Sequence, residues 1–260
     1  HLDRNKFESL ELQFFSGGTQ WPCLCETISQ LKELRKITLD AGNVEIAPAC
    51  TDFLQAIRQN SNIRLVILRD ICISPLVFDI AAQVAHLELD DSKLSEDFAA
   101  LNRPCSIQNI DLKCNDDRIV HRILNSVSPA KLTLCYGWAD NDFSPVSASS
   151  LEQLLQRNHV HTLILENMDV TTETAAVLTG IAENTSVVDF ELAGCRFDKS
   201  SEQVFKHVLA SKDKQLHSLN LLNLEADLQD ALVSLLQPNS SLREFHFRGH
   251  LQRKGMYPWI

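Results

Sequence analysis

The sequence predicts an α/β solenoid, a horseshoe in which a parallel sheet lines the concave side and helices cover the convex side. Three observations predict it. One short apolar motif recurs along almost the whole chain, the segments between its copies have apolar residues at helical spacing, and no single copy could bury its own apolar face. We therefore expect about ten stacked units that form a single domain over residues 1–260.

The motif consists of three apolar positions, the first two separated by two variable residues and the last two by one. Its central residues lie 21 to 31 positions apart. The last two apolar positions alternate with mostly polar residues, as expected of a strand with one buried face. The copies are Phe7-Leu10-Leu12, Leu34-Ile37-Leu39, Ile63-Val66-Leu68, Val84-Leu87-Leu89, Ile107-Ile110-Leu112, a degraded copy at Leu132-Leu134, Val160-Leu163-Leu165, Val187-Phe190-Leu192, Leu216-Leu219-Leu221 and Leu242-Phe245-Phe247.

Helices are expected between the strands, because apolar residues recur there on one helical face. We expect helix starts at Ser74, Ser149 and Ser200, and helix ends in the left-handed conformation at Asn60, Asn158, Asn184 and Asn239. The repeats centred on Val66, Leu87 and Ile110 are short, so their convex segments should be abbreviated. The helical segments are Phe53-Leu54-Ile57, Leu151-Leu154-Leu155, Val177-Leu178-Ile181, Val204-Phe205-Val208-Leu209 and Leu232-Leu235-Leu236.

One repeat carries a more specific signature in Val187, Phe190, Leu192, Cys195 and Phe197. With these residues the chain resembles the ribonuclease-inhibitor-like, or cysteine-containing, class of leucine-rich repeats. Asn115 and Ser92 occupy the equivalent turn place in other repeats. The chain departs from the pattern where other residues replace the expected Cys or Asn, so the buried turn ladder is imperfect: these are Ile71, Met168 and Leu224. Because the first residue is His1, we expect a fragment of a larger protein.

Composition restricts the class of partner and the compartment. The formal net charge is −10, the opposite of what phosphate contacts require, so we expect no nucleic-acid binding. No apolar stretch is long enough for membrane insertion. Eight cysteines are too few for a disulfide-stapled scaffold, which favours reduced thiols and a cytoplasmic location. Two glycosylation sequons, at Asn184 and Asn239, favour the alternative, an extracellular protein.

The residues that flank the buried strand positions should point into the concave face. Leu65 and Ile67 would form an apolar patch there, unless a loop covers them or the register slips by one residue. Acidic groups surround the patch and recur in the later repeats, and an apolar patch rimmed by charge is typical of a protein-docking surface. The predicted partner-binding residues are Lys36, Asp40, Leu65, Ile67, Arg69, His86, Glu88, Asp90, Asp111, Glu166, Asp189 and Glu191.

Catalytic, phosphate-binding and metal motifs are missing from the sequence, so we expect no catalytic residue, no cofactor and no metal. Cys23 and Cys25 have no further ligands nearby for zinc. The triplet Cys50-Thr51-Asp52 has the form Cys-x-Asp, which some bacterial effector ligases with leucine-rich repeats use in a separate helical domain. A structural role near a helix start is the favoured interpretation of the triplet. A cysteine-dependent enzyme resembling a ubiquitin ligase is the alternative function.

The favoured function is a protein–protein recognition module that selects a protein partner with its concave face and edges. The resemblance implies roles such as ubiquitin-ligase substrate recognition, a pathogen effector delivered into a host cell, or the repeat domain of an innate immune receptor. The expected partner is another protein with a basic or mixed surface. A homodimer formed through Leu65 and Ile67 is a further alternative.

Overall fold

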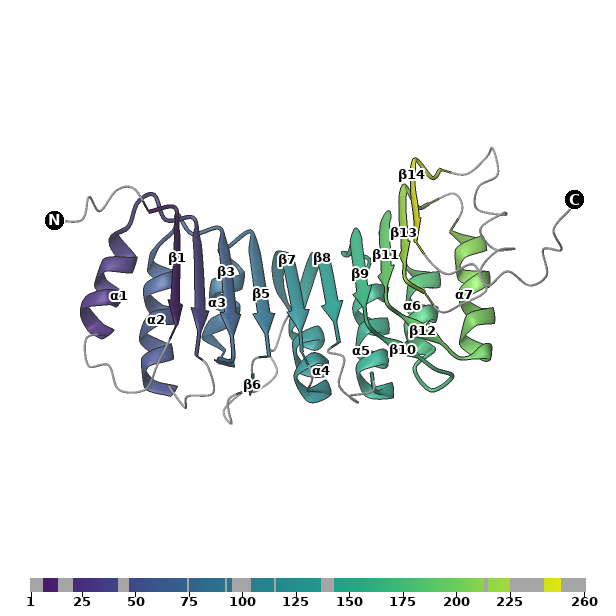
Figure 1. The fold of residues 1–260 in the computed structure, drawn as a ribbon, viewed down its shortest axis with the longest axis horizontal. Helices are drawn as coiled ribbons and strands as arrows, with labels where there is room; N and C mark the ends of the chain where they lie inside the picture. The colour runs from purple at the N-terminus through teal and green to yellow at the C-terminus, as the bar shows by residue number, and fades with distance from the viewer. Residues whose placement is uncertain are drawn as a thin grey trace, which may run out of the picture. The chain divides into compact units, whose positions relative to one another are not determined.

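The computed structural model describes residues 7–13, 21–41, 47–73, 75–91, 93–94, 104–114, 116–136, 143–212, 215–224 and 241–248. The fold is α/β, with parallel strands that alternate with helices along the chain (Figure 1). The chain divides into two compact units, unit 1 (His1–Asn141) and unit 2 (Asp142–Ile260). The expected helix around Leu235, and the expectations for Ser74, Ser92, Asn115 and Asn239, fall outside the described residues.

Unit 1 contains one parallel sheet, with each strand hydrogen-bonded to the next in the order β1-β2-β3-β5-β7-β8. A short two-stranded sheet of β4 and β6 pairs the turns that follow β3 and β5. The strands are β1 (Ser9–Gln13), β2 (Lys36–Asp40), β3 (Leu65–Arg69), β4 (Cys72–Ile73), β5 (His86–Asp90), β6 (Lys93–Leu94), β7 (Cys105–Lys113) and β8 (Val127–Cys135). The helices are α1 (Trp21–Gln30), α2 (Ala47–Gln59), α3 (Leu76–Ala81) and α4 (Asp117–Ser126).

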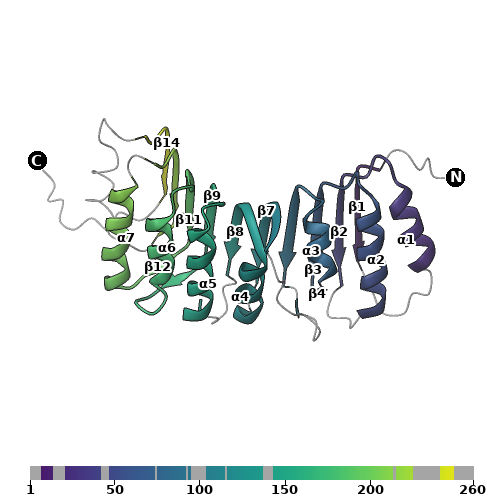
Figure 2. The same ribbon diagram turned by 180° about the vertical axis from the view of Figure 1, so that it is seen from behind.

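Unit 2 repeats this plan, with parallel strands in the order β9-β11-β13-β14 and a small pair of β10 and β12. Its helices α5, α6 and α7 lie side by side over the strands (Figure 2). The strands are β9 (Thr162–Glu166), β10 (Asp169–Val170), β11 (Asp189–Ala193), β12 (Arg196–Phe197), β13 (Ser218–Leu222) and β14 (Glu244–Arg248). The helices are α5 (Pro145–Gln156), α6 (Ala176–Glu183) and α7 (Lys199–Ser211).

The last two apolar positions of every copy of the motif lie on a described strand. Ile37 pairs with Val66, and Val66 with Leu87, so equivalent apolar residues stand side by side and point toward the helices. These three residues are fully buried, and even the degraded copy places Leu132 and Leu134 in the core. In unit 2, Phe205 of α7 stacks on Phe197 with ring centroids 4.9 Å apart. The apolar periodicity therefore predicts the strands and their facing correctly.

The expected helix starts differ from the observed ones. The helix predicted from Ser149 begins at Pro145 and is capped by Ser144, whose side chain accepts from the Ser147 N–H. The helix predicted from Ser200 is capped by Asp198 instead. Each true cap lies upstream of the serine that was predicted, Ser149 or Ser200, which also fits the capping pattern. The abbreviated convex segment is confirmed for α3, which has six residues, but it is wrong for the repeat centred on Ile110, whose helix α4 has ten residues, as many as α1.

The asparagines at the helix ends have a role that the sequence did not predict. Only Asn158 is in the left-handed conformation, with φ 56°. Asn184 is fully buried, and its amide donates to the Leu155 carbonyl of the preceding repeat at 2.6 Å. Asn60 does the same toward the Ile28 carbonyl at 2.7 Å. These side chains satisfy the free carbonyls of the previous helix end, so they join adjacent repeats.

Left-handed residues occur instead directly after the strands. Four acidic or amide residues and one glycine have positive φ there, between 44° and 64°. This position needs a residue that tolerates the left-handed region, which explains the recurrence of Asn, Asp and Gly. Gly194 is further constrained because a Cβ atom there would lie 2.5 Å from Asn167 Oδ1. The five residues are Asp70, Asp91, Asn167, Gly194 and Asn223.

Candidate protein-binding surface on the open sheet faces

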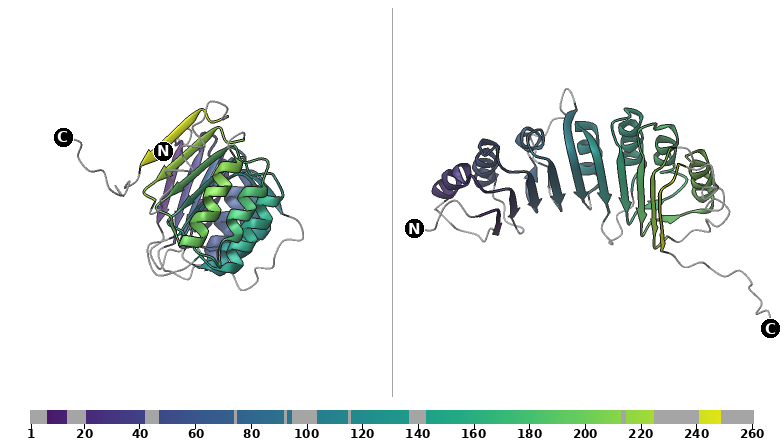
Figure 3. Two further views of the ribbon diagram at one scale, coloured as in Figure 1. Left: turned by 90° about the vertical axis from the view of Figure 1, so that its right-hand side faces the viewer. Right: turned by 90° about the horizontal axis from the view of Figure 1, so that it is seen from above.

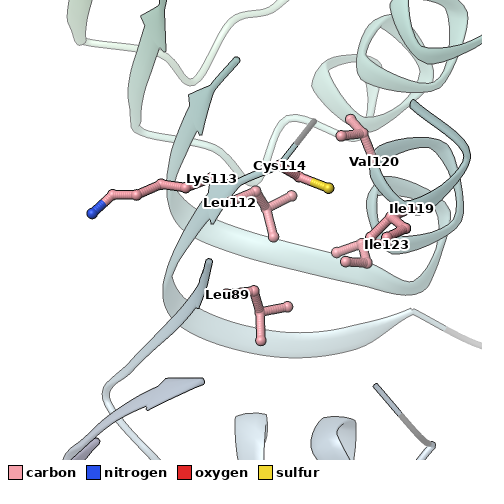
Figure 4. A pocket seen from close by; sticks show the side chains of 7 residues that line it. All are labelled: Leu89, Leu112, Lys113, Cys114, Ile119, Val120 and Ile123. Atoms are coloured by element: carbon pink, nitrogen blue, oxygen red, sulfur yellow. The ribbon is translucent and has the colours of Figure 1, made fainter. Parts of the chain in front are cut away.

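In each unit the described helices lie on one side of the sheet, and we call the opposite side the open face (Figure 3). Figure 4 shows the two sides at one strand of unit 1: Leu112 points toward Ile119 and Ile123 of α4, whereas Lys113 points away from them. The apolar crevice in that view leaves no water-sized space, so it is part of the core. Alternate residues of each strand therefore form the open face, as predicted.

The expected apolar patch on the open face of unit 1 is smaller than predicted. Leu65 is half-buried, but Ile67 is only 6% exposed. Ile67 pairs with Thr38 on one side and Glu88 on the other. Because adjacent strands lie only about 4.8 Å apart, side chains in the middle of a strand cover one another. The expectation that Ile67 is exposed is thus wrong. The register has not slipped, so that explanation is wrong too.

The charged residues of unit 1 form pairs between neighbouring strands. Arg69 Nε lies 3.4 Å from Asp90 Oδ2. Lys113 Nζ donates to Glu88 Oε1 at 2.7 Å. Each pair joins β5 to the strand beside it, so the acidic group predicted here is largely neutralised within the chain.

A third pair joins β5 and β7. His86 Nε2 and Asp111 Oδ2 lie 2.9 Å apart. Burial opposes ionisation of Asp111, but hydrogen bonds with His86 and Thr133 outweigh it and lower the pKa of the carboxyl. Burial has the larger effect at Asp90, where the pKa is raised even though Lys113 and Arg69 act in the opposite direction. The remaining predicted residues of this face, Lys36 and Asp40, are half-buried on β2.

The open face of unit 2 carries Glu166, Asp189 and Glu191, all half-buried. Asp189 accepts from Thr162 Oγ1 at 3.3 Å, and Glu191 accepts from Asn220 Nδ2 at 2.9 Å. Among the residues that the structure describes, none of the three carboxylates forms an ion pair. Their neighbours on adjacent strands explain this, since all are neutral: Thr162, Ser218, Ile164, Asn220 and Ala193.

Two residues of this face were missed by the sequence reasoning. Ala193 and Leu222 end β11 and β13 and pair with each other beside Glu166 and Arg248. Both are half-buried. The alternation of residues along the strands could have identified them, because Ala193 lies two residues after Glu191 and Leu222 lies two residues after Asn220. The face therefore combines carboxylates with small half-exposed apolar side chains.

Four of the described thiols, those of Cys25, Cys105, Cys114 and Cys195, lack the features of an activated nucleophile. Burial raises the pKa of the Cys114 thiol to about 11 and that of Cys195 to about 12. Burial, followed by the nearby carboxylates of Asp52 and Asp79, also raises the pKa of Cys25 and Cys105. A raised pKa leaves little thiolate at neutral pH, the reverse of what a catalytic cysteine needs. Thr51 and Asp52 are exposed on α2, while the side chain of Cys50 lies outside the described residues.

Within the described part of the chain, no three His, Cys, Asp or Glu side chains are placed to hold a metal ion. No described helix combines the length and apolar character needed to cross a membrane. Comparison with protein-family models gives no match, and comparison with curated proteins gives none either. What is shown of this chain is therefore an α/β fold with parallel strands, an arrangement compatible with a repeat solenoid.

Proposed function

We propose that the chain is a leucine-rich-repeat solenoid of the ribonuclease-inhibitor-like class and serves as a protein-recognition module. The strictly parallel strands, the motif register and the one-sided helices support the repeat assignment. A sheet face that the described helices leave uncovered offers many aligned side chains on a rigid frame. Such a frame suits selection of a protein surface.

The observation that carries this proposal is the difference in charge pairing between the two open faces. Glu88 and Asp90 already have cationic partners in unit 1, and Asp111 is paired with His86, so an incoming cation would have to displace these side chains. Glu166, Asp189 and Glu191 have none among the described residues, and their neutral neighbours leave their potential unopposed. We therefore place the main contact on unit 2 and propose a partner with a basic or mixed surface.

The alternative of a cysteine-dependent enzyme has no observation in its favour. The raised pKa values of the Cys25, Cys105, Cys114 and Cys195 thiols argue against it. We propose instead a non-catalytic role, and we propose the cytoplasm as its place because the free thiols are compatible with a reducing compartment.

A pair of charge-reversal variants tests the binding face. D189R/E191R alters the open face of unit 2, and E173R/E183R makes the same change in net charge at exposed residues elsewhere in that unit. Partners that crosslink to the wild-type chain would be identified by mass spectrometry, and each would then be purified and its affinity measured. We expect at least a tenfold loss with D189R/E191R and less than a twofold change with the control.

Equal losses with both variants would indicate nonspecific attraction to negative charge. Unchanged binding with both would exclude this face. A further variant, E88R/D111R, separates the two units. If it alone abolished binding, the partner would dock on unit 1, and the assignment to unit 2 would be wrong.

A further inference from the structure

The two end strands of the described sheets each have an open edge. β1 pairs only with β2, and β14 pairs only with β13, among the strands that the structure describes. An unpaired edge presents a row of backbone N–H and C=O groups that can accept another strand. The strands within each unit are parallel, so β1 offers its edge to a strand running in its own direction, and so does β14.

The apolar side chains of both end strands are also incompletely covered. Leu10 and Leu12 of β1 are half-buried, as are Phe245 and Phe247 of β14. The equivalent residues of interior strands, such as Leu39, are at most 2% exposed. Each end thus presents apolar surface beside an open edge, a combination that a further strand with the same facing would cover.

We propose that copies of this chain associate head to tail, with β14 of one copy pairing in parallel with β1 of a second copy. Placing Phe245 beside Leu10 continues the register that β13 and β14 already share. The same register sets Phe247 beside Leu12. Apolar residues then meet apolar residues on the helix side of the junction.

In that register Arg243 falls opposite Glu8, so one pair of opposite charges meets across the junction. His246 falls opposite Glu11, and both Arg248 and Glu244 lie diagonally from Glu11, where attraction and repulsion offset each other. None of these residues forms an ion pair with another described residue. A contact between two different edges is heterologous, so it adds copies head to tail, in an open chain or a ring, rather than forming a symmetric dimer. This association is independent of partner binding by the open faces.

Sedimentation of the purified full chain over a range of concentrations tests the proposal. Since two five-residue strands bury little surface, the dissociation constant should lie between about 100 µM and about 1 mM. The weight-average mass should therefore rise steadily with concentration and should not stop at a dimer. A chain that stays monomeric up to about 1 mM would overturn the proposal.

Matched charge reversals identify the edges. E8R/E11R makes β1 basic, and R243E/R248E makes β14 acidic, so each variant alone should repel itself and remain monomeric. An equimolar mixture restores opposite charges at every junction and should regain the mass of the wild type. Recovery on mixing also shows that both variants are folded. Association of either variant alone at wild-type strength, or no recovery in the mixture of two variants with native circular dichroism, would contradict this pairing.

Discussion

The open faces of the two units both carry carboxylates, yet they place them in different surroundings. In unit 1, Glu88 and Asp111 have a lysine and a histidine on the neighbouring strand. In unit 2, Asp189 and Glu191 accept hydrogen bonds from a hydroxyl and an amide on the neighbouring strands. The comparison teaches that charge composition does not decide what a sheet face can attract. The residue on the adjacent strand decides it, because that residue either pairs with the carboxylate or leaves its negative charge unpaired.

The largest effects are expected from the buried amides that join repeats in both units. Asn184→Ala would leave the Leu155 carbonyl and two backbone N–H groups, of Ser186 and Val187, without their partner. We expect a loss of about 2–3 kcal/mol in the free energy of unfolding, measured by urea denaturation. Asn60→Ala is the matched change in unit 1. Hydrogen exchange should show each loss within its own unit, and a uniform loss across both would mean that the two units unfold as one.

A smaller effect is expected at the turn after β11. Gly194→Ala places a methyl group against Asn167 Oδ1 and forces a non-glycine residue into a positive φ. The cost should be about 1–2 kcal/mol by the same measurement. Asn223→Gly is the control, since Asn223 already adopts the left-handed conformation. If Gly194→Ala were as mild as that control, the close approach to Asn167 would be unimportant.

Neutralising one carboxylate on each face compares their surroundings directly. Glu88→Gln removes the ion pair with Lys113, whose side chain is 44% exposed, so the loss should be only about 0.5 kcal/mol. Glu191→Gln keeps the bond from Asn220 and relieves repulsion from Asp189, so stability should change by less than about 0.3 kcal/mol. Thermal melts at low and high salt would test this. A larger loss for Glu191→Gln would show that its charge has a cationic partner.

Asp198→Asn is expected to act on the pH dependence of stability: an asparagine still caps a helix, but it keeps only one acceptor oxygen, whereas both oxygens of Asp198 accept hydrogen bonds, from Ser201 and from Thr172. The backbone N–H and hydroxyl of Ser201 are the leading cause of the strongly lowered pKa of Asp198, and Thr172 adds to it. Its contribution is therefore complete above the ordinary pKa of 3.8 and is lost as the pH falls further. The variant should flatten this part of the acid unfolding curve.

Asp90→Asn is expected to change stability at neutral pH in the opposite direction, because the raised pKa of Asp90 means that ionisation of its carboxyl costs stability there.

The strands, and the side of each strand that faces the core, could be predicted from the sequence. Apolar residues at every second position can all be buried only when that side faces the core. Two helix starts were predicted wrongly; at α5 Ser149 was chosen, although Ser144 followed by Pro145 carries the clearer start signal. The binding face was predicted residue by residue, but its electrostatics were not. That required the strand register, which brings Lys113 beside Glu88 although they are 25 positions apart. Ile67 shows the same limitation, since its exposure depends on Thr38 and Glu88.

The burial of Asn184 has a consequence for biosynthesis. This residue is the acceptor of an Asn-Thr-Ser sequon, but its amide nitrogen is committed to the Leu155 carbonyl inside the protein. An oligosaccharide can be attached there only before the repeat closes, and once attached it would keep the two neighbouring repeats apart. A sugar on Asn184 would therefore be a mark of chains that failed to fold.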